Sequence, residues 1–131
     1  MARITKTTRR WFEMEGDEDG ARVEIKALTP GEKADIGTAA LDVRLVYSAD
    51  SKALNTEQRM NPQAEMEMTA KLAVVGWENF FRADGKPLVC TKANILKAVR
   101  EIDGFGRFVS MSLQKLNQDL ADEAEEQEKN S

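Results

Sequence analysis

The residues of this sequence that could carry out chemistry are its carboxylates and one cysteine, Cys90. The chain contains no histidine, so it lacks the side chain that most often serves as a general base or a metal ligand near neutral pH. This absence excludes every arrangement in which histidine activates a serine or cysteine nucleophile. With one cysteine, a structural zinc site of the usual cysteine and histidine composition is excluded as well.

Cys90 lies between Val89 and Thr91, and Thr91 is a suitable capping residue for a helix that follows. A position near a helix N-terminus would lower the pKa of the thiol and favour the reactive thiolate. No partner base accompanies it, and we therefore interpret Cys90 as a small buried thiol. A single cysteine also excludes an internal disulfide, which fits a reducing cytoplasm.

Two short motifs resemble ligand-binding loops only in part. The acidic stretch 17–20 has the carboxylates of a calcium loop, but it lacks the glutamate that should follow and the flanking helices. The Gly-Phe-Gly stretch 104–106 is too short to cradle a phosphate and is better explained as the end of one helix and the start of another. The other carboxylates lie in turns, on polar helix faces and near the C-terminus, where nothing would raise their pKa for acid catalysis. We therefore expect no enzymatic activity, no cofactor and no bound metal.

Apolar side chains must then carry the function, through contacts with another protein. Met66 and Met68 would lie about 200° apart on a helix, so one of them should be exposed unless another surface covers it. We predict that the partner-binding surface combines the 77–81 segment with part of the last apolar helix. The candidate residues are Met68, Trp77, Phe80, Phe81, Phe108, Leu113 and Leu116. The same apolar stripe is a candidate for self-association, so a homo-oligomer is the alternative use of these residues.

The charges of the chain are separated along its length. Residues 1–9 form a basic arm, and residues 121–131 form an acidic tail that we expect to be disordered because it repels itself. A single folded domain should therefore span residues 10–120. The arm has dispersed charges without interleaved aromatic side chains, and we expect no nucleic-acid partner.

A chain of 131 residues with a net charge of −4 is expected to form one domain with a modest core. No apolar run approaches the roughly 20 residues that cross a bilayer. The basic start has no apolar segment behind it, as a secretory signal would have. We therefore expect a cytoplasmic protein without a membrane partner.

Alternating apolar and polar residues predict a β-hairpin at the start of the domain, on both sides of the polar loop 15–20. Thr29, Pro30 and Glu32 then form the capping box and first turn of a helix, which should be short because Gly37 follows. The segment 41–47 alternates as a strand does, with 56–60 as its returning strand. An extension of the helix is the alternative for the same segment, and we favour the strand.

Three further helices are expected in the second half of the chain. Asn61 and Pro62 open a helix that continues to Trp77, and Thr91 caps the next one. The last helix starts near Phe105 and has the best 3.6-residue pattern in the chain. The expected fold class is therefore α+β, with an N-terminal β-hairpin or small antiparallel sheet followed by a mostly helical domain of three to four helices.

Leu28, Thr29 and Glu32 lie at the start of the first expected helix, and Gly76 and Trp77 lie at the end of the second. Asp84 and Gly85, Pro87 and Leu88, and Thr91 then follow as a turn, an extended step and a helix cap. In this order of motifs the sequence resembles the tail assembly chaperones of long-tailed bacteriophages and prophages. In that family a hairpin leads into a Leu-Thr-x-x-Glu helix start. Later a helix ends in a Gly-Trp pair, and an Asp-Gly turn, a Pro-Leu step and a Thr- or Ser-capped helix follow. The matching residues, within a resemblance that covers roughly residues 10–120, are Leu28, Thr29, Glu32, Gly76, Trp77, Asp84, Gly85, Pro87, Leu88 and Thr91. Cys90 stands where a second acidic or apolar position would be expected.

The resemblance implies that the protein binds the long tape-measure protein of the tail in the host bacterial cytoplasm. It would keep that protein soluble while subunits of the tail-tube protein, a further expected partner, polymerise around it. The resemblance also implies a longer product made by ribosomal frameshifting, which a protein sequence does not show. Two other classes stay open: a structural tail-completion or head-tail joining subunit, which would persist in virions, and a small regulatory binding domain.

Overall fold

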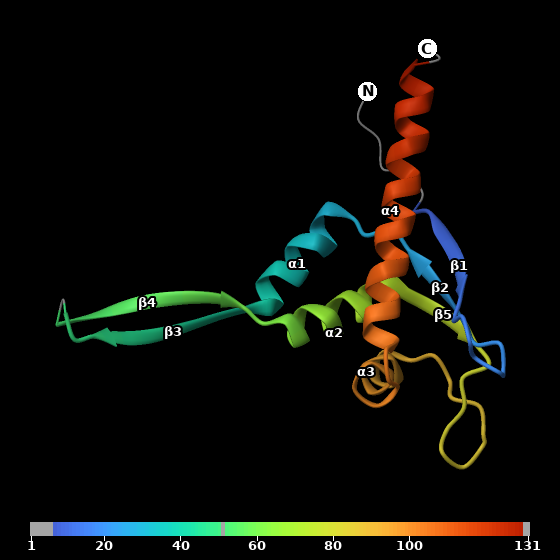
Figure 1. The fold of residues 1–131 in the computed structure, drawn as a ribbon, viewed down its shortest axis with the longest axis horizontal. Coiled ribbons are helices and arrows are strands. Elements are labelled where there is room, and N and C mark those ends of the chain that lie inside the picture. Colours follow the sequence, from blue (N-terminus) through green and yellow to red (C-terminus); the bar gives the residue numbers. More distant parts are fainter. Residues whose placement is uncertain (1–6, 51, 130–131) are drawn as a thin grey trace.

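The computed structural model describes residues 7–50 and 52–129. Figure 1 shows a small sheet beside a long helix and a two-stranded ribbon that projects away from both. The elements in chain order are β1 (Arg9–Glu13), β2 (Arg22–Lys26), α1 (Pro30–Ala40), β3 (Leu41–Ser48), β4 (Ala53–Met60), α2 (Pro62–Ala73), β5 (Val74–Glu78), α3 (Lys92–Glu101) and α4 (Phe105–Lys129). The fold class is α+β, as the sequence predicts. Most of the predicted basic arm lies outside the described residues.

The predicted N-terminal hairpin is confirmed and forms part of a three-stranded antiparallel sheet in the order β1-β2-β5. Phe12 of β1 lies opposite Val23 of β2, and Val23 lies opposite Trp77 of β5. Val23 and Ile25 are fully buried, whereas Glu24 between them is partly exposed. This alternation places one face of β2 against the core.

The helix that begins at Pro62 is shorter than the sequence predicts. We expected it to continue to Trp77, and that prediction was wrong, because α2 ends at Ala73 and the chain continues as β5. Val74 and Val75 are β-branched and favour an extended backbone. β2 offers them a free edge, and strand pairing there outweighs the local helical pattern. The segment 77–81 is therefore the end of a strand and a loop rather than the end of a helix.

The core lies between the three-stranded sheet and the helices α2, α3 and α4. Trp77 and Phe80 are stacked, with ring centroids 4.4 Å apart and planes inclined by 5°. Phe105 lies edge-on to both rings, at 6.0 and 5.7 Å. The indole N–H of Trp77 donates to the Leu88 carbonyl at 2.7 Å, so the polar atom of the ring is also paired.

α2 and α4 approach each other closely at Gly106. A Cβ atom added there would lie 2.7 Å from Cγ of Met66 and 3.3 Å from Cγ1 of Val99, so only glycine fits without displacement. Met66 is half-buried at this crossing, and Met68 is half-buried as well. Neither methionine is therefore exposed, because α1, α3 and α4 all pack against α2 and supply the covering surface on which that expectation depended.

The capping motifs read from the sequence are present at the helix starts. Thr29 accepts a hydrogen bond from the Glu32 amide at 3.1 Å, and Glu32 accepts one from the Thr29 amide at 3.0 Å. The side chain of Asn61 accepts a hydrogen bond from the Ala64 amide and caps α2, and that of Thr91 accepts one from the Asn94 amide and caps α3. α1 is longer than expected, because it continues through Gly37 to Ala40. A glycine costs a helix only about 1 kcal/mol and does not have to end it.

The acidic segment that we expected to be disordered is helical as far as Lys129, since α4 continues through it. Its residues are mostly alanine, glutamate and glutamine, which are good helix formers. Lys129 lies 3.6 Å from Glu125 one turn earlier, a spacing that supports an exposed helix. Residues 130 and 131 lie outside the described part of the chain. Among the described residues, no helix is long and apolar enough to cross a membrane.

Candidate functional site

The β3–β4 hairpin, which we call the ribbon, has two faces of opposite character. Leu41 lies opposite Met60 and Tyr47 lies opposite Leu54, so the register is continuous along both strands. Because side chains alternate between the two sides of a strand, every second cross-strand pair lies on the same face. One face, which we call the apolar face, consists of Leu41, Val43, Leu45, Tyr47, Leu54, Thr56, Gln58 and Met60.

The apolar face is open to solvent. Leu45 is 70% exposed, Leu54 67% and Tyr47 63%. Most of the large apolar side chains that are exposed in the described chain belong to the ribbon. These values show that no other element of the described chain covers this face. Contiguous exposed apolar surface on a folded protein marks a site of interaction.

The opposite face of the ribbon is polar and carries charges of both signs. The register places Asp42 opposite Arg59, and Glu57 lies two residues before Arg59 on the same face. The Arg59 guanidinium lies 3.1 Å from the Glu57 carboxylate, so these charges are paired within the ribbon. Antiparallel sheets that cover a core alternate between apolar and polar residues in this manner. The ribbon therefore has the pattern of a sheet with a core-facing side, but no element in the described part of the chain packs against that side.

The root of the ribbon is held by the two helices that flank it. α1 ends at Ala40 and β3 begins at the next residue, while β4 ends at Met60, two residues before α2. The Asn61 amide donates to the Ala40 carbonyl at 2.7 Å, which closes the root. The Asn61 side chain accepts from the amide of Ala64 and so caps α2. The helices thus fix the direction in which the ribbon leaves the body (Figure 1).

The structure places most of the sequence-predicted site residues inside the protein. Phe80, Leu113 and Leu116 are buried. Met68, Trp77 and Phe108 are half-buried, and the last two pack against the core. Phe81 is the exposed member, at 46%. In this conformation the set stabilises the core more than it presents a surface, and its role in partner binding stays a prediction.

Sequence reasoning did not select the residues of the apolar face as site residues. The alternation in segment 41–47 was the available indication, and the strand alternative that it favoured is confirmed. The returning strand begins at Ala53, three residues before the predicted start. Alternation alone does not tell whether an apolar face is covered, because that depends on where the rest of the chain packs.

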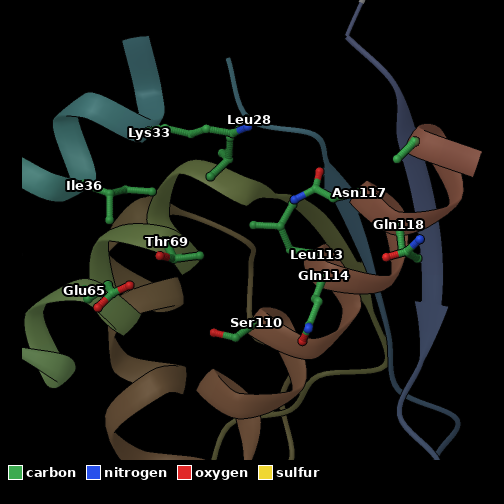
Figure 2. Close-up of a pocket in the computed structure, with 11 residues that line it drawn as sticks. Leu28, Lys33, Ile36, Glu65, Thr69, Ser110, Leu113, Gln114, Asn117 and Gln118 are labelled. Atoms are coloured by element: carbon green, nitrogen blue, oxygen red, sulfur yellow. The ribbon is translucent and has the colours of Figure 1, made fainter. Parts of the chain in front are cut away.

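A hollow of about 570 Å³ lies between α1, α2 and α4 (Figure 2). Figure 2 shows Lys33 and Ile36 on α1, with Glu65 and Thr69 on α2. The side of α4 contributes mainly amide and hydroxyl side chains, namely Ser110, Gln114, Asn117 and Gln118. Glu65 is the one carboxylate in this lining, so the hollow holds no pair of acids. Among the described residues, no group of three or more histidine, cysteine or acidic side chains is placed to hold a metal ion.

Cys90 has the properties of a structural thiol. It is half-buried just before α3. Burial raises the pKa of its thiol above the ordinary value, although the nearby charge of Lys92 acts in the opposite direction. A raised pKa keeps the thiol protonated near neutral pH, which makes it a poor nucleophile.

Comparisons with known proteins give no relative for this chain. No protein-family model matches it, no curated protein matches it, and no solved structure matches it. Function must therefore be inferred from the surface of the molecule and from the order of its sequence motifs.

Proposed function

We propose that the protein is a phage or prophage tail assembly chaperone that binds the tape-measure protein through the apolar face of the ribbon. The observation that carries the proposal is the uncovered apolar face, with Leu45 and Leu54 about two-thirds exposed. The order of sequence motifs supports the family, and the ribbon supports a role in binding an apolar segment of another protein. In this proposal the protein acts in the host bacterial cytoplasm, with the tail-tube protein as a further partner.

The dimensions of the apolar face suit a helical client segment. β3 and β4 have eight residues each. The face is therefore about 27 Å long, which equals the length of roughly 18 residues of α-helix. A client helix with apolar residues at i, i+3, i+4 and i+7 would lie along the two rows of side chains. Leu45, Tyr47 and Leu54 would then be covered by the client.

The remaining surface would keep such a complex soluble. The polar face of the ribbon points away from the client, and its Arg59 and Glu57 charges are paired with each other. The end of α4 adds exposed acidic side chains, namely Asp122, Glu123, Glu125, Glu126 and Glu128. Net negative charge on an exposed helix opposes aggregation of the complex.

A structural tail-completion or head-tail joining subunit is the second candidate. The projecting ribbon favours it, because an extended arm can also hold a neighbouring subunit in a finished particle. The two candidate functions differ in whether the protein remains in the finished virion. A chaperone is absent from purified virions, whereas a structural subunit remains in them, and mass spectrometry of virions separates the two.

The test of the proposed function is co-expression with the tape-measure protein that the proposal expects to be encoded beside this gene. We expect the tagged wild-type chain to keep that protein in the soluble fraction and to co-purify with it. Leu45→Glu should abolish co-purification, whereas Val46→Glu, which adds the same charge on the other face, should preserve it. Equal co-purification by both variants would remove the ribbon from the binding site. A gene neighbourhood without tail genes would remove the family assignment.

A further inference from the structure

We infer that, when no client is bound, a second copy of this chain covers the apolar face, with the two ribbons packed face to face and running in opposite directions. The pairing itself stands independently of the proposed function. Only the statement that the client displaces the second copy rests on that function.

The ribbon needs a covering surface that residues 7–50 and 52–129 do not supply. A two-stranded hairpin is marginally stable in water unless a hydrophobic face packs against something else. The apolar face is exposed along its whole length, from Leu41 at the root to Leu54 near the tip. Two ribbons packed face to face form two sheets about 10 Å apart with a shared apolar interior.

The order of side chains on the apolar face is self-complementary. A twofold axis perpendicular to the strands places β3 over β3 and reverses its direction. Leu41 then lies over Tyr47 of the second copy, and Val43 lies over Leu45. On the other strand Met60 lies over Leu54, and Gln58 lies over Thr56. Every apolar residue meets an apolar residue, and the two polar residues meet each other, where they can form a hydrogen bond.

The other face-to-face arrangement is less favourable. An axis along the strands would place Val43 over Gln58 and Leu45 over Thr56. It would also bring both folded bodies to the same end of the paired ribbons. Because the ribbon projects away from the body (Figure 1), the antiparallel arrangement puts the bodies at opposite ends. The apolar face carries no charged side chain, so like charges do not oppose the contact.

The size of the face sets the strength of this contact. It consists of eight residues per copy, whereas each partner contributes roughly 20–30 residues to a standard protein interface. The pairing is therefore weak and depends on concentration. A weak pairing protects the apolar face at rest and leaves it accessible to a client that makes more contacts.

Sedimentation velocity over a series of protein concentrations tests the pairing. We expect the wild-type chain to shift from monomer toward dimer as the concentration rises. Leu45→Glu should remain monomeric, because its charge would be buried in the pair, and Val46→Glu should behave as wild type. A wild-type chain that stays monomeric up to several hundred micromolar overturns the inference, as does equal behaviour of the two variants.

A mixing experiment tests the register. Leu45→Glu and Val43→Lys should each be monomeric alone and should form a heterodimer when mixed, because residue 45 of one copy lies over residue 43 of the other. The matched control mixes Leu45→Glu with Leu45→Lys, in which the new charges do not face each other, and it should form no heterodimer. Heterodimer in both mixtures, or in neither, overturns the antiparallel register. Circular dichroism of each variant verifies that the ribbon charge leaves the body folded.

The two proposals fail in distinguishable ways. If the wild-type chain is monomeric and Leu45→Glu still loses the tape-measure protein, the pairing is overturned and the proposed function stands. If the dimer forms but the tape-measure protein is not bound, the proposed function is overturned. If the chain both dimerises and binds the tape-measure protein, adding a soluble tape-measure fragment should convert the dimer to a complex that contains one copy of this chain.

Discussion

Leu45 and Val46 are neighbours in β3, yet their side chains lie on opposite faces of the ribbon. Leu45 is 70% exposed on the apolar face, and Val46 is 39% exposed on the face that carries Asp42 and Arg59. Neither side chain belongs to the core of the body. The pair therefore allows the same charge to be added one residue apart, with only one of the two positions on the proposed binding surface.

Adding a charge to the ribbon should leave the stability of the body unchanged. For Leu45→Glu and Val46→Glu we expect a free energy of unfolding within about 0.5 kcal/mol of wild type at low protein concentration, because both side chains are exposed. Chemical denaturation followed by tryptophan fluorescence measures this, since Trp77 reports on the core. A loss of several kcal/mol in either variant would show that the ribbon and the body unfold as one unit.

Gly106 should accommodate a side chain poorly at the crossing of α2 and α4, because the Met66 side chain must shift to make room. Gly106→Ala is expected to lower the free energy of unfolding by about 1–3 kcal/mol, because the added methyl group overlaps Met66. Gly37→Ala is the matched control, since an added Cβ there meets nothing within 4 Å and lies in the helix α1. It should raise stability by about 0.5–1 kcal/mol. Equal effects of the two substitutions would contradict the close approach of the helices.

Trp77 is expected to act through stability rather than through direct contact with a partner. Trp77→Phe removes the hydrogen bond to the Leu88 carbonyl and part of the stacking on Phe80, and should cost about 1–3 kcal/mol. Trp11→Phe, at a position 37% exposed, should cost no more than about 0.5 kcal/mol. Thermal denaturation compares the two variants.

The binding assay then separates the two roles of Trp77. At a temperature at which Trp77→Phe is fully folded, we expect it to bind the tape-measure protein as wild type does. Weaker binding by the folded variant would support the sequence prediction that Trp77 belongs to the partner surface.

Glu32 should make stability depend on pH in the acidic range. Burial acts to raise the pKa of its carboxyl, but hydrogen bonds from Lys26 and from the Thr29 amide outweigh it and hold the pKa below the ordinary value. A carboxyl with a lowered pKa in the folded state stabilises the fold fully above its unfolded pKa of about 4.3. That contribution is lost as the pH falls through the lower pKa of the folded state.

Melting temperatures between pH 7 and pH 3 measure this dependence. We expect Glu32→Gln to melt at a lower temperature than wild type at pH 7 and to approach wild type at pH 3. Glu65→Gln, in the first turn of α2, is the control for loss of one exposed carboxylate. A constant difference between Glu32→Gln and wild type over the whole range would contradict the assigned role of the ionised carboxylate.

The end of α4 should be dispensable for the folded body. Residues 121–129 are helical and exposed, so deletion of residues 121–131 should leave the melting temperature within a few degrees of wild type. The helical signal in circular dichroism should fall when it is expressed per residue as well as per molecule, because residues 121–129 of the deleted segment are helical. An unchanged helical signal per molecule would instead support the disordered tail that the charge pattern predicts.

The sequence by itself determined the features that depend on neighbouring residues. Thr29, Asn61 and Thr91 cap their helices because a side-chain oxygen and the amides of the next turn lie within a few residues of each other. The N-terminal hairpin follows from alternation on both sides of a polar loop. The lack of histidine excludes histidine-dependent catalysis by composition alone. These features do not depend on where distant segments lie.

Only the tertiary structure decided which apolar residues are covered. Val74 to Glu78 form a strand because β2, about fifty residues earlier, offers an edge. Trp77, Phe80 and Leu116 face the interior because the sheet and α4 meet there, whereas Leu45 and Leu54 face solvent because no segment of the described chain folds over the ribbon. Burial depends on contacts between residues far apart in sequence. The same apolar pattern therefore formed a core in one place and an uncovered surface in another.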